Sequence, residues 1–318
     1  MRLLFAALVL SCLTPPSYAQ QYPNRPIRMV VGFSAGGGPD ITARLVAPKL
    51  AAILGQQVVI DNRPGAGGSI AEDIVAKAAP DGYTILACSN SLSISPFLYE
   101  KLPYDPVRDL QPIHMLAVSA QVLVVQPTFA AKSVAELIAL AKSKPGQFTF
   151  ASSGNGAGSH LAGELFKLLT ATEMVHVPYK GGGQGVTAVI SGETNMMFAP
   201  IAAAIPHVRA GRLRALAVTT SQRTAAASDI PTMQEAGVPR YEAFPWYALL
   251  VPARTPKHIT EALEKATKQV LAQPDTRERM LTLGLDASNI GSAEFSRFLK
   301  VEMNRWQEVV RKAALRPN

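Results

Sequence analysis

The chain has 318 residues, of which 48% are hydrophobic, and 31 basic against 23 acidic side chains give it a formal charge of +8. This length is enough for two domains of about 150 residues, each with a core of its own. A positive charge favours acidic small molecules, a membrane surface or nucleic acid as partners. We expect no nucleic-acid partner, because the basic residues are scattered along the chain without a basic run.

The first 19 residues have the layout of a cleaved secretory signal peptide. Arg2 precedes an apolar stretch, residues 3–13, and the small residues Ser17 and Ala19 predict cleavage after Ala19. The apolar stretch is far shorter than the ~20 residues of a membrane-spanning helix. Cleavage before Cys12, which would then carry lipid, is the alternative, but Leu10 fits a lipoprotein site poorly. We therefore expect a protein secreted to the periplasm.

Removal of the signal peptide leaves 299 residues with a formal charge of +7, because that segment holds one basic and no acidic residue. Cys88 is then the only cysteine, which excludes an intramolecular disulfide even in an oxidising compartment. Burial of apolar surface must therefore hold the mature fold together.

From Ile27 onward, short β-branched runs alternate with helical patterns, which predicts an α/β fold with mostly parallel sheets flanked by helices. The expected strands are residues 27–33, 57–61, 83–88, 148–151, 174–177, 196–198 and 213–219. Two long apolar passages, 115–126 and 244–251, are each followed by a proline and suit crossings between two lobes. We therefore place lobe 1 at 22–120 plus 245–318, and an inserted lobe 2 at 121–244.

Several helices carry sequence signals for their first residues. Asp40, Ser133, Thr232 and Thr255 are each expected to cap a helix that follows them, and Ser133 and Thr232 stand three residues before a glutamate, which is capping-box spacing. From Ser292 onward, apolar residues recur at helical spacing, and we interpret this stripe as core packing rather than as a binding surface.

Glycine-rich loops follow four of the predicted strands, two in each predicted lobe. They are residues 34–40, 62–69, 152–160 and 179–183, and a serine-rich turn, 89–93, follows a further strand. Converging backbone N–H groups at a strand-to-helix turn can bind an anion, although a single loop of this kind is equally well a tight turn. Four such loops favour an anion site at the carboxyl ends of the strands. Backbone donors and hydroxyl groups suit a carboxylate.

Seven segments in this order resemble the Bug family, the extracytoplasmic substrate-binding receptors of tripartite tricarboxylate transporters. They are residues 26–44, 62–69, 102–106, 152–163, 177–181, 209–219 and 231–237, so the likeness covers essentially the whole mature chain. The resemblance implies a two-lobed periplasmic-binding-protein fold of the Venus-flytrap type (type II), with two crossing strands. It also implies a carboxylated ligand held between the lobes, partly through ordered water.

The family's ligand loops, carried over to this chain together with the adjoining His160, give the predicted ligand-binding residues. They are Phe33, Ser34, Gly36, Gly37, Gly38, Gly65, Ala66, Gly67, Gly68, Ser89, Asn90, Ser91, Ser153, Gly154, Asn155, Gly158, Ser159, His160, Tyr179, Lys180 and Gly181. The chain departs from the family pattern at Ser34-Ala35, at Pro39, which lacks an N–H, and at Ala199-Pro200. These departures bear on the choice of ligand rather than on the fold.

Catalytic and metal sites are not indicated. The five histidines show no metal-ligand spacing, and the serines near glycines do not form a nucleophile elbow. Cys88, at a strand end, is interpreted as a small buried hydrophobe. We therefore expect no cofactor, no metal and no enzyme activity.

The expected function is capture of a small organic acid and its delivery to membrane subunits of a tripartite tricarboxylate-type transporter, by a monomer. A periplasmic sensor for a membrane histidine kinase is the alternative, and an organic-acid hydrolase or lyase is the third. The residues do not distinguish an aliphatic dicarboxylate from an aromatic acid, a keto acid or an amino acid.

Overall fold

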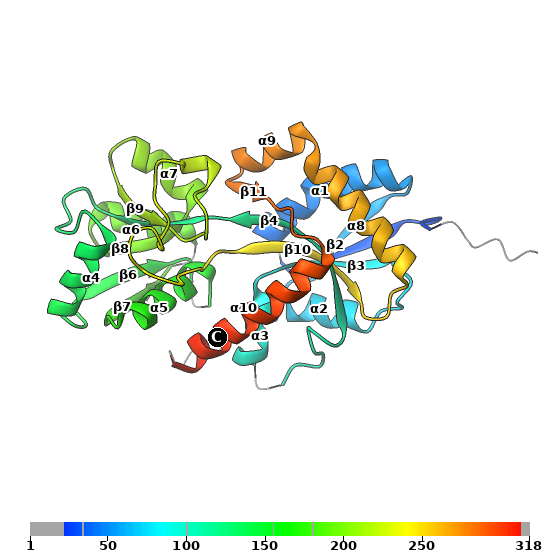
Figure 1. Cartoon of the computed structure of the whole chain (residues 1–318), viewed down its shortest axis with the longest axis horizontal. Coiled ribbons are helices and arrows are strands. Elements are labelled where there is room, and N and C mark those ends of the chain that lie inside the picture. Colours follow the sequence, from blue (N-terminus) through cyan, green and yellow to red (C-terminus); the bar gives the residue numbers. More distant parts are fainter. Residues whose placement is uncertain (1–21, 34, 100, 155, 180, 313–318) are drawn as a thin grey trace, which may run out of the picture.

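The computed structural model describes residues 22–33, 35–99, 101–154, 156–179 and 181–312. The predicted signal peptide and its cleavage after Ala19 lie outside these residues. The described chain forms two α/β lobes, each built on one β-sheet (Figure 1). None of its helices is long and apolar enough to cross a bilayer.

Lobe 1 is built on a six-stranded sheet with the strand order β11-β4-β10-β3-β1-β2. Its strands are β1 (Ile27–Val31), β2 (Val58–Asn62), β3 (Thr84–Ser89), β4 (Leu110–Ser119), β10 (Trp246–Pro252) and β11 (Leu285–Ala287). Its helices are α1 (Gly38–Leu54), α2 (Ser69–Ala76), α3 (Ser91–Leu98), α8 (Lys257–Ala272), α9 (Pro274–Thr282) and α10 (Ser292–Lys312). A short 3₁₀ turn, η1 (Ala66–Gly68), precedes α2.

Lobe 2 is built on a five-stranded sheet with the order β7-β6-β8-β5-β9. Its strands are β5 (Gln121–Val125), β6 (Phe148–Ser152), β7 (Met174–Pro178), β8 (Met196–Pro200) and β9 (Arg214–Val218). Its helices are α4 (Val134–Ser143), α5 (Gly158–Thr170), α6 (Gly182–Ser191) and α7 (Ile201–Arg209), followed by a 3₁₀ turn, η2 (Ala225–Ala227). Each predicted strand is present to within two residues at either end.

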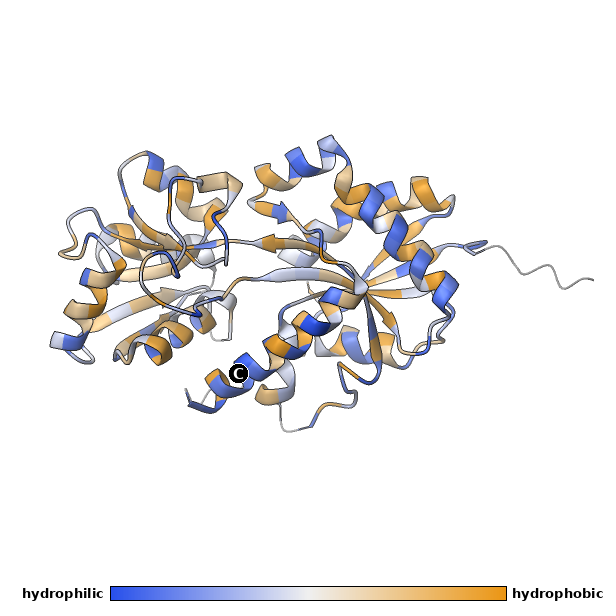
Figure 2. Cartoon of the chain, in the orientation of Figure 1, coloured by the Kyte–Doolittle hydropathy of each residue, from blue (hydrophilic) through white to orange (hydrophobic). Residues whose placement is uncertain are grey.

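Side chains alternate between the two faces of each sheet and meet different helices there. In lobe 1, Met29 on β1 packs with α1 and α8, whereas its neighbour Val30 packs with α2 and α10. In lobe 2, Leu123 on β5 packs with α4 and α5, whereas its neighbour Val124 packs with α6 and α7. Both sheets are therefore buried between helices, and in Figure 2 their strands are predominantly coloured as hydrophobic.

The two sheets are mixed rather than mostly parallel. β1 pairs in parallel with β2 and β3, and β6 pairs in parallel with β7 and β8. The strands next to the crossings, β10 in lobe 1 and β5 in lobe 2, run antiparallel to both their neighbours. Because each of these strands brings the chain in from the other lobe, it begins at the edge where the parallel strands end.

The chain passes between the sheets at two places. The outgoing crossing is Ala120, which is fully buried between β4 and β5. On the return, Pro245 accepts a hydrogen bond of 2.8 Å from the backbone N–H of Ser119, so the two crossings lie side by side. The division into lobes at residues 121 and 244 stays a prediction, which this sheet membership supports.

Helix α10 packs on both lobes. Phe295 and Leu299 in its first half lie in the core of lobe 1 with Trp246. Trp306 and Val309 in its second half lie in the core of lobe 2 with residues of α5. The apolar stripe predicted from the sequence is therefore core packing, and it joins the two lobes a third time (Figure 1).

Of the four predicted caps, one begins a helix. Thr232 and Glu235 exchange the two capping-box hydrogen bonds, at 3.1 and 2.7 Å, but a turn follows them rather than a helix. Ser133 caps α4, because its hydroxyl accepts the N–H of Glu136 at 3.2 Å. The cap predicted for Thr255 is wrong, since its hydroxyl donates to the carbonyl of Pro252. The cap predicted for Asp40 is also wrong, because α1 begins earlier, at Gly38, and Asp40 lies inside its first turn.

Candidate functional site

The predicted loops lie at the edges of the two sheets that face the crossings. At this edge of lobe 1, Ser89 at the end of β3 is paired with Tyr247 near the start of β10. At this edge of lobe 2, Pro200 at the end of β8 is paired with Gln121 at the start of β5. Loops after β1, β2, β3, β6 and β7 therefore surround the crossings from both sides.

The loop after β1 leads into α1 and is held by Asp40. The backbone N–H of Gly36 donates to one Asp40 carboxylate oxygen at 2.9 Å, and the amide of Asn62 donates to the other at 2.8 Å. The same Asn62 amide donates to the carbonyl of Phe33, so the loops after β1 and β2 are tied together. Burial by itself raises the pKa of Asp40, but hydrogen bonds from Arg44, Gly36 and Asn62 hold it below its usual value. Ser34 lies outside the described residues.

The loop after β2 has a backbone that favours glycine. Gly65, Ala66, Gly67 and Gly68 have φ angles of 132°, 47°, 64° and 105°, a region that side chains rarely adopt. Gly65, Ala66 and Gly67 are exposed, so their backbone groups are accessible to a ligand. Gly68 is buried, and a Cβ there would stand 3.3 Å from Phe33, from the Ser91 hydroxyl and from Glu72. The predicted residues Phe33, Gly68 and Ser91 are therefore brought together.

The serine-rich turn after β3 adds two linked hydroxyl groups to this edge. The hydroxyl groups of Ser89 and Ser91 lie 2.9 Å apart, and Ser93 donates to the backbone carbonyl of Asn90 at 2.7 Å. Ser89 and Asn90 are buried and Ser91 is half-buried. Of these side chains, Ser91 is the one that reaches the Gly65–Gly68 loop.

A buried carboxyl group, Glu72, lies directly behind the Gly65–Gly68 loop. Tyr104 donates a short hydrogen bond to Glu72, which is 1% exposed. Burial raises the pKa of Glu72 from 4.5 to about 7, although the bond from Tyr104 acts in the opposite direction. The folded state thus favours the protonated form of Glu72. Protonated Glu72 adds to the free energy of unfolding below pH 4.5, and this contribution is lost as the pH rises from 4.5 through about 7.

Replacing Glu72 with Gln should remove this pH dependence, because the Gln oxygen can still accept from Tyr104. We expect Glu72→Gln to raise the free energy of unfolding by about 3 kcal/mol at pH 8 and to leave it unchanged at pH 4. Urea unfolding at both pH values measures the difference. An equal effect of Glu72→Gln at pH 4 and pH 8 would contradict the raised pKa.

The loop after β6 repeats the construction of the first loop in lobe 2. The N–H of Gly156 donates to the ring Nδ1 of His160 at 3.0 Å, as the N–H of Gly36 does to Asp40, four residues further along in both cases. The hydroxyl of Ser159 accepts the N–H of Ser153 at 2.8 Å. Helix α5 begins at Gly158 as α1 begins at Gly38. Asn155 lies outside the described residues.

His160 lies behind this loop rather than on its surface. It is 7% exposed, and its ring stacks on that of His176 with the ring centroids 3.7 Å apart. Nε2 of His176 lies 2.6 Å from the Ser152 hydroxyl. Burial lowers the pKa of each ring to about 4. His160 thus contacts the loop after β6, and its contact with a ligand stays a prediction.

The histidine pair predicts a loss of stability in acid. Each ring is neutral when folded, so its contribution is fully present above pH 6.5 and is lost as the pH falls through about 4, by up to about 3 kcal/mol per ring. His176→Phe keeps a stacked ring and should make the decline in unfolding free energy between pH 6.5 and 4 shallower. The matched control is His258→Gln on the exposed face of α8, which should keep the wild-type slope. Equal slopes for His176→Phe and wild type would exclude the pair as the cause.

The loop after β7 lies beside the loop after β6. The Tyr179 hydroxyl donates to Glu193 at 2.7 Å, and a Cβ on Gly154 would stand 3.4 Å from the Tyr179 carbonyl oxygen. Gly181 precedes α6, and a Cβ on the next residue, Gly182, would stand 3.4 Å from the Ser153 hydroxyl and 2.9 Å from Pro200. This loop therefore adjoins the loop after β6 and the end of β8. Lys180 and its side chain lie outside the described residues.

Two residues that were not predicted, Tyr247 and Gln121, lie on the crossing strands between the predicted loops. A Cβ on Gly38 would overlap the hydroxyl of Tyr247, and a Cβ on Gly158 would stand 3.0 Å from Nε2 of Gln121. The one sequence signal for them is a polar residue within an otherwise apolar crossing passage. The first residue of α1 and the first residue of α5 are thus both glycines. Because glycine has no side chain, a crossing strand can approach each helix end.

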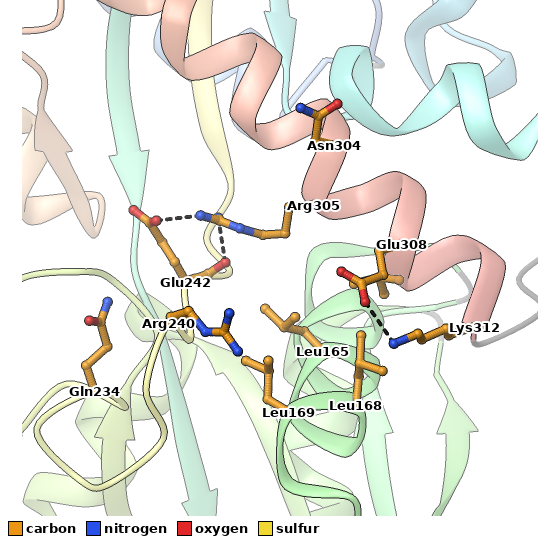
Figure 3. A pocket seen from close by; sticks show the side chains of 11 residues that line it. Leu165, Leu168, Leu169, Gln234, Arg240, Glu242, Asn304, Arg305, Glu308 and Lys312 are labelled. Atoms are coloured by element: carbon orange, nitrogen blue, oxygen red, sulfur yellow. Dashed lines mark hydrogen bonds and ion pairs between the residues drawn. The ribbon is translucent and has the colours of Figure 1, made fainter.

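A separate groove of about 730 Å³ lies between α5, α10 and residues 234–242 (Figure 3). Leu165, Leu168 and Leu169 form its apolar side, and none of the predicted ligand residues lines it. Its rim includes two ion pairs, Arg305 with Glu242 at 2.7 Å and Lys312 with Glu308 at 2.8 Å. The groove therefore follows the contact of α10 with lobe 2, at a distance from the predicted loops.

Two further candidates for chemistry in the described ranges are a metal-ligating cluster and the thiol of Cys88. No cluster of three or more His, Cys, Asp or Glu side chains there is placed to hold a metal ion. Cys88 is 2% exposed, and burial raises the pKa of its thiol well above the usual value. Its predicted position in the core is confirmed.

Comparisons with known proteins identify the family. The model of the tripartite tricarboxylate transporter family receptor matches residues 42–315. Protein BugT of Bordetella pertussis is 37% identical over 301 residues, which cover 94% of this chain and 92% of BugT.

Two solved structures share both sequence and fold with the chain. A Rhodopseudomonas palustris protein solved with adipate is 34% identical, with a TM-score of 0.76 over 93% of this chain and all of the other. MatC of the same organism, solved with malate, is 31% identical, with a TM-score of 0.73 over 91% of this chain and all of MatC. The predicted family and two-lobed fold are thus confirmed, and the chain belongs to the receptor family of tripartite tricarboxylate transporters.

Proposed function

We propose that this chain is a periplasmic solute-binding protein that captures a small organic acid between its two lobes. It releases the acid unchanged to the membrane subunits of a tripartite tricarboxylate-type transporter. The proposal includes export through the segment that ends at Ala19. It assigns no chemical step to the chain.

The observation that carries the proposal is the matched pair of helix ends beside the crossings. Helices α1 and α5 both begin at a glycine, and both glycines adjoin polar side chains of the crossing strands. The N-terminal end of a helix carries unpaired N–H groups and a partial positive charge, so it favours an anion. Two such ends, one from each lobe, suit an acid that lies between the lobes.

The choice of a carboxylate rests on the donors and on the relatives. The exposed backbone of Gly65–Gly67 and the hydroxyl of Ser91 are hydrogen-bonding groups that a carboxylate accepts well. Two structural relatives were solved with the dicarboxylates adipate and malate. Because donors come from both lobes, binding should favour a closed arrangement of the lobes.

Mass spectrometry of the small molecule that copurifies with the exported protein tests this proposal. We expect a carboxylic acid at up to one molecule per chain, and re-adding it to stripped protein at a hundred times its Kd should stabilise the fold by about 2.7 kcal/mol. A bound neutral or cationic solute would contradict the carboxylate site. A bound acid that is consumed on incubation would instead indicate an enzyme.

A further inference from the structure

The structure places two polar side chains, one from each crossing strand, against the first residues of α1 and α5. Tyr247 from β10 reaches Gly38, where a Cβ would overlap its hydroxyl. Gln121 from β5 reaches Gly158. These side chains lie where the helix ends of the two lobes meet the crossings, and both are uncharged.

Of these two side chains, Gln121 has a buried polar atom that lacks a hydrogen-bond partner. The residue is 3% exposed, and its Oε1 atom is buried without a hydrogen-bond partner. Its backbone is fixed, because its N–H donates to the Thr219 hydroxyl at 3.2 Å and its carbonyl accepts the Thr219 N–H at 2.9 Å. A buried amide that lacks a partner is costly, so a group that completes its hydrogen bonds gains affinity.

A hydroxyl group is the ligand group that completes this amide. It both donates and accepts, so it pairs with the oxygen or with the nitrogen of the Gln121 amide, whichever end is turned toward it. An ammonium group would require a negative charge nearby, and the carboxylate of Asp40 is already engaged by Gly36, Asn62 and Arg44. A plain methylene chain forms no hydrogen bond, so the Gln121 amide oxygen would still lack a partner.

We propose that Gln121 is a specificity-determining residue that binds a hydroxyl substituent of the captured acid, so that hydroxy-dicarboxylates bind more tightly than unsubstituted dicarboxylates. This proposal rests on the proposed function, since it places a carboxylate at each helix end. The hydroxyl between the carboxylates then lies beside the crossing strand. Pro39 removes one N–H donor from the end of α1, which leaves the crossing strands to supply polar contacts there.

Malate and succinate, which differ by one hydroxyl group, are the probes. Calorimetric titration of wild type should give a Kd for malate at least about tenfold lower than that for succinate. Gln121→Met keeps the length of the side chain and removes the amide. It should bring the ratio of the two Kd values to within about twofold through loss of malate affinity, with the Kd for succinate changed by less than about threefold.

Gln126→Met is the matched control, because Gln126 follows the other end of β5 and its amide donates to Ile190 at 2.9 Å. This variant should keep the wild-type preference for malate. If Gln121→Met fails to fold, Gln121→Glu keeps the shape. Titration at about pH 9 keeps the introduced carboxyl charged although burial raises its pKa, and this charge should weaken both acids about a hundredfold or more. Wild-type affinity in a folded Gln121→Glu would overturn the placement.

The outcomes separate the two proposals. A folded Gln121→Met variant that keeps the wild-type malate-to-succinate ratio overturns the role of Gln121. A wild-type protein that binds other carboxylates, but neither malate nor succinate, overturns the hydroxyl preference and leaves the proposed function intact. A wild-type protein that binds no carboxylate overturns both.

Discussion

Gly67→Asp is expected to weaken binding of the acid about a hundredfold while leaving the fold intact. Gly67 is exposed in the loop after β2, and among the described residues a Cβ there would meet only the Tyr99 and Ser95 hydroxyls, at 3.6 and 4.0 Å. Two like charges about 5 Å apart at an effective dielectric constant of about 20 repel by about 3 kcal/mol, which is about a hundredfold in Kd. Calorimetric titration with the copurified acid measures the change.

The matched control is Gly67→Asn, which has the shape of Asp without its charge. Gly67 has a φ of 64°, and Asn and Asp tolerate this left-handed backbone better than other side chains. The two variants should therefore unfold at the same urea concentration, and Gly67→Asn should retain most of the affinity. A folded Gly67→Asp variant with wild-type affinity would show that the carboxylate does not lie at this loop.

Trp306→Ala is expected to lower the free energy of unfolding by about 3–5 kcal/mol, the largest effect on stability predicted here. Trp306 is 1% exposed in the core of lobe 2 although it belongs to α10, which begins in the core of lobe 1. Its indole N–H donates to the buried carboxylate of Glu302 at 3.0 Å, so truncation also removes a donor from that group. Urea unfolding followed by circular dichroism measures the loss.

Val301→Ala is the control for this substitution. Val301 lies on the same helix and is 57% exposed, so its truncation should change the free energy of unfolding by less than about 0.5 kcal/mol. A loss below about 1 kcal/mol for Trp306→Ala would contradict the packing of α10 on lobe 2.

The sheets and the loop positions were predictable because they depend on local patterns. β-branched runs set the strands, and four consecutive residues from Gly65 to Gly68 have positive φ angles where the sequence is almost all glycine. The extended strands on either side of Ala120 were predictable from an unusually long apolar passage. In each case the neighbouring residues alone specify the conformation.

Other features depend on contacts between distant segments, which no local pattern specifies. The stacking of His160 on His176 joins α5 to β7, and it places His160 behind the loop. Gln121 and Tyr247 belong to apolar passages. The apolar residues indicate that these passages are buried, but they do not indicate which helix end each side chain contacts. Likewise, the stripe on α10 indicates that the helix is buried, but the lobe that buries its second half follows only from the fold.

The capping prediction for Asp40 failed for a local reason. Gly37 has an extended backbone, with φ −72° and ψ 159°, and ends the loop three residues earlier than the polar side chain of Asp40 suggests. Asp40 then lies in the first turn and accepts the N–H of Gly36 instead of capping the helix. A carboxylate in the first turn still suits the helix dipole, so the residue fits both arrangements.

Reversible binding of a carboxylate is the central claim, and equilibrium dialysis of the mature protein against an isotope-labelled form of the copurified acid tests it most directly. We predict saturation at one molecule per chain, competition by the unlabelled acid and full recovery of the label in the original compound after denaturation. Failure to saturate, or recovery of the label in a different compound, would contradict the account.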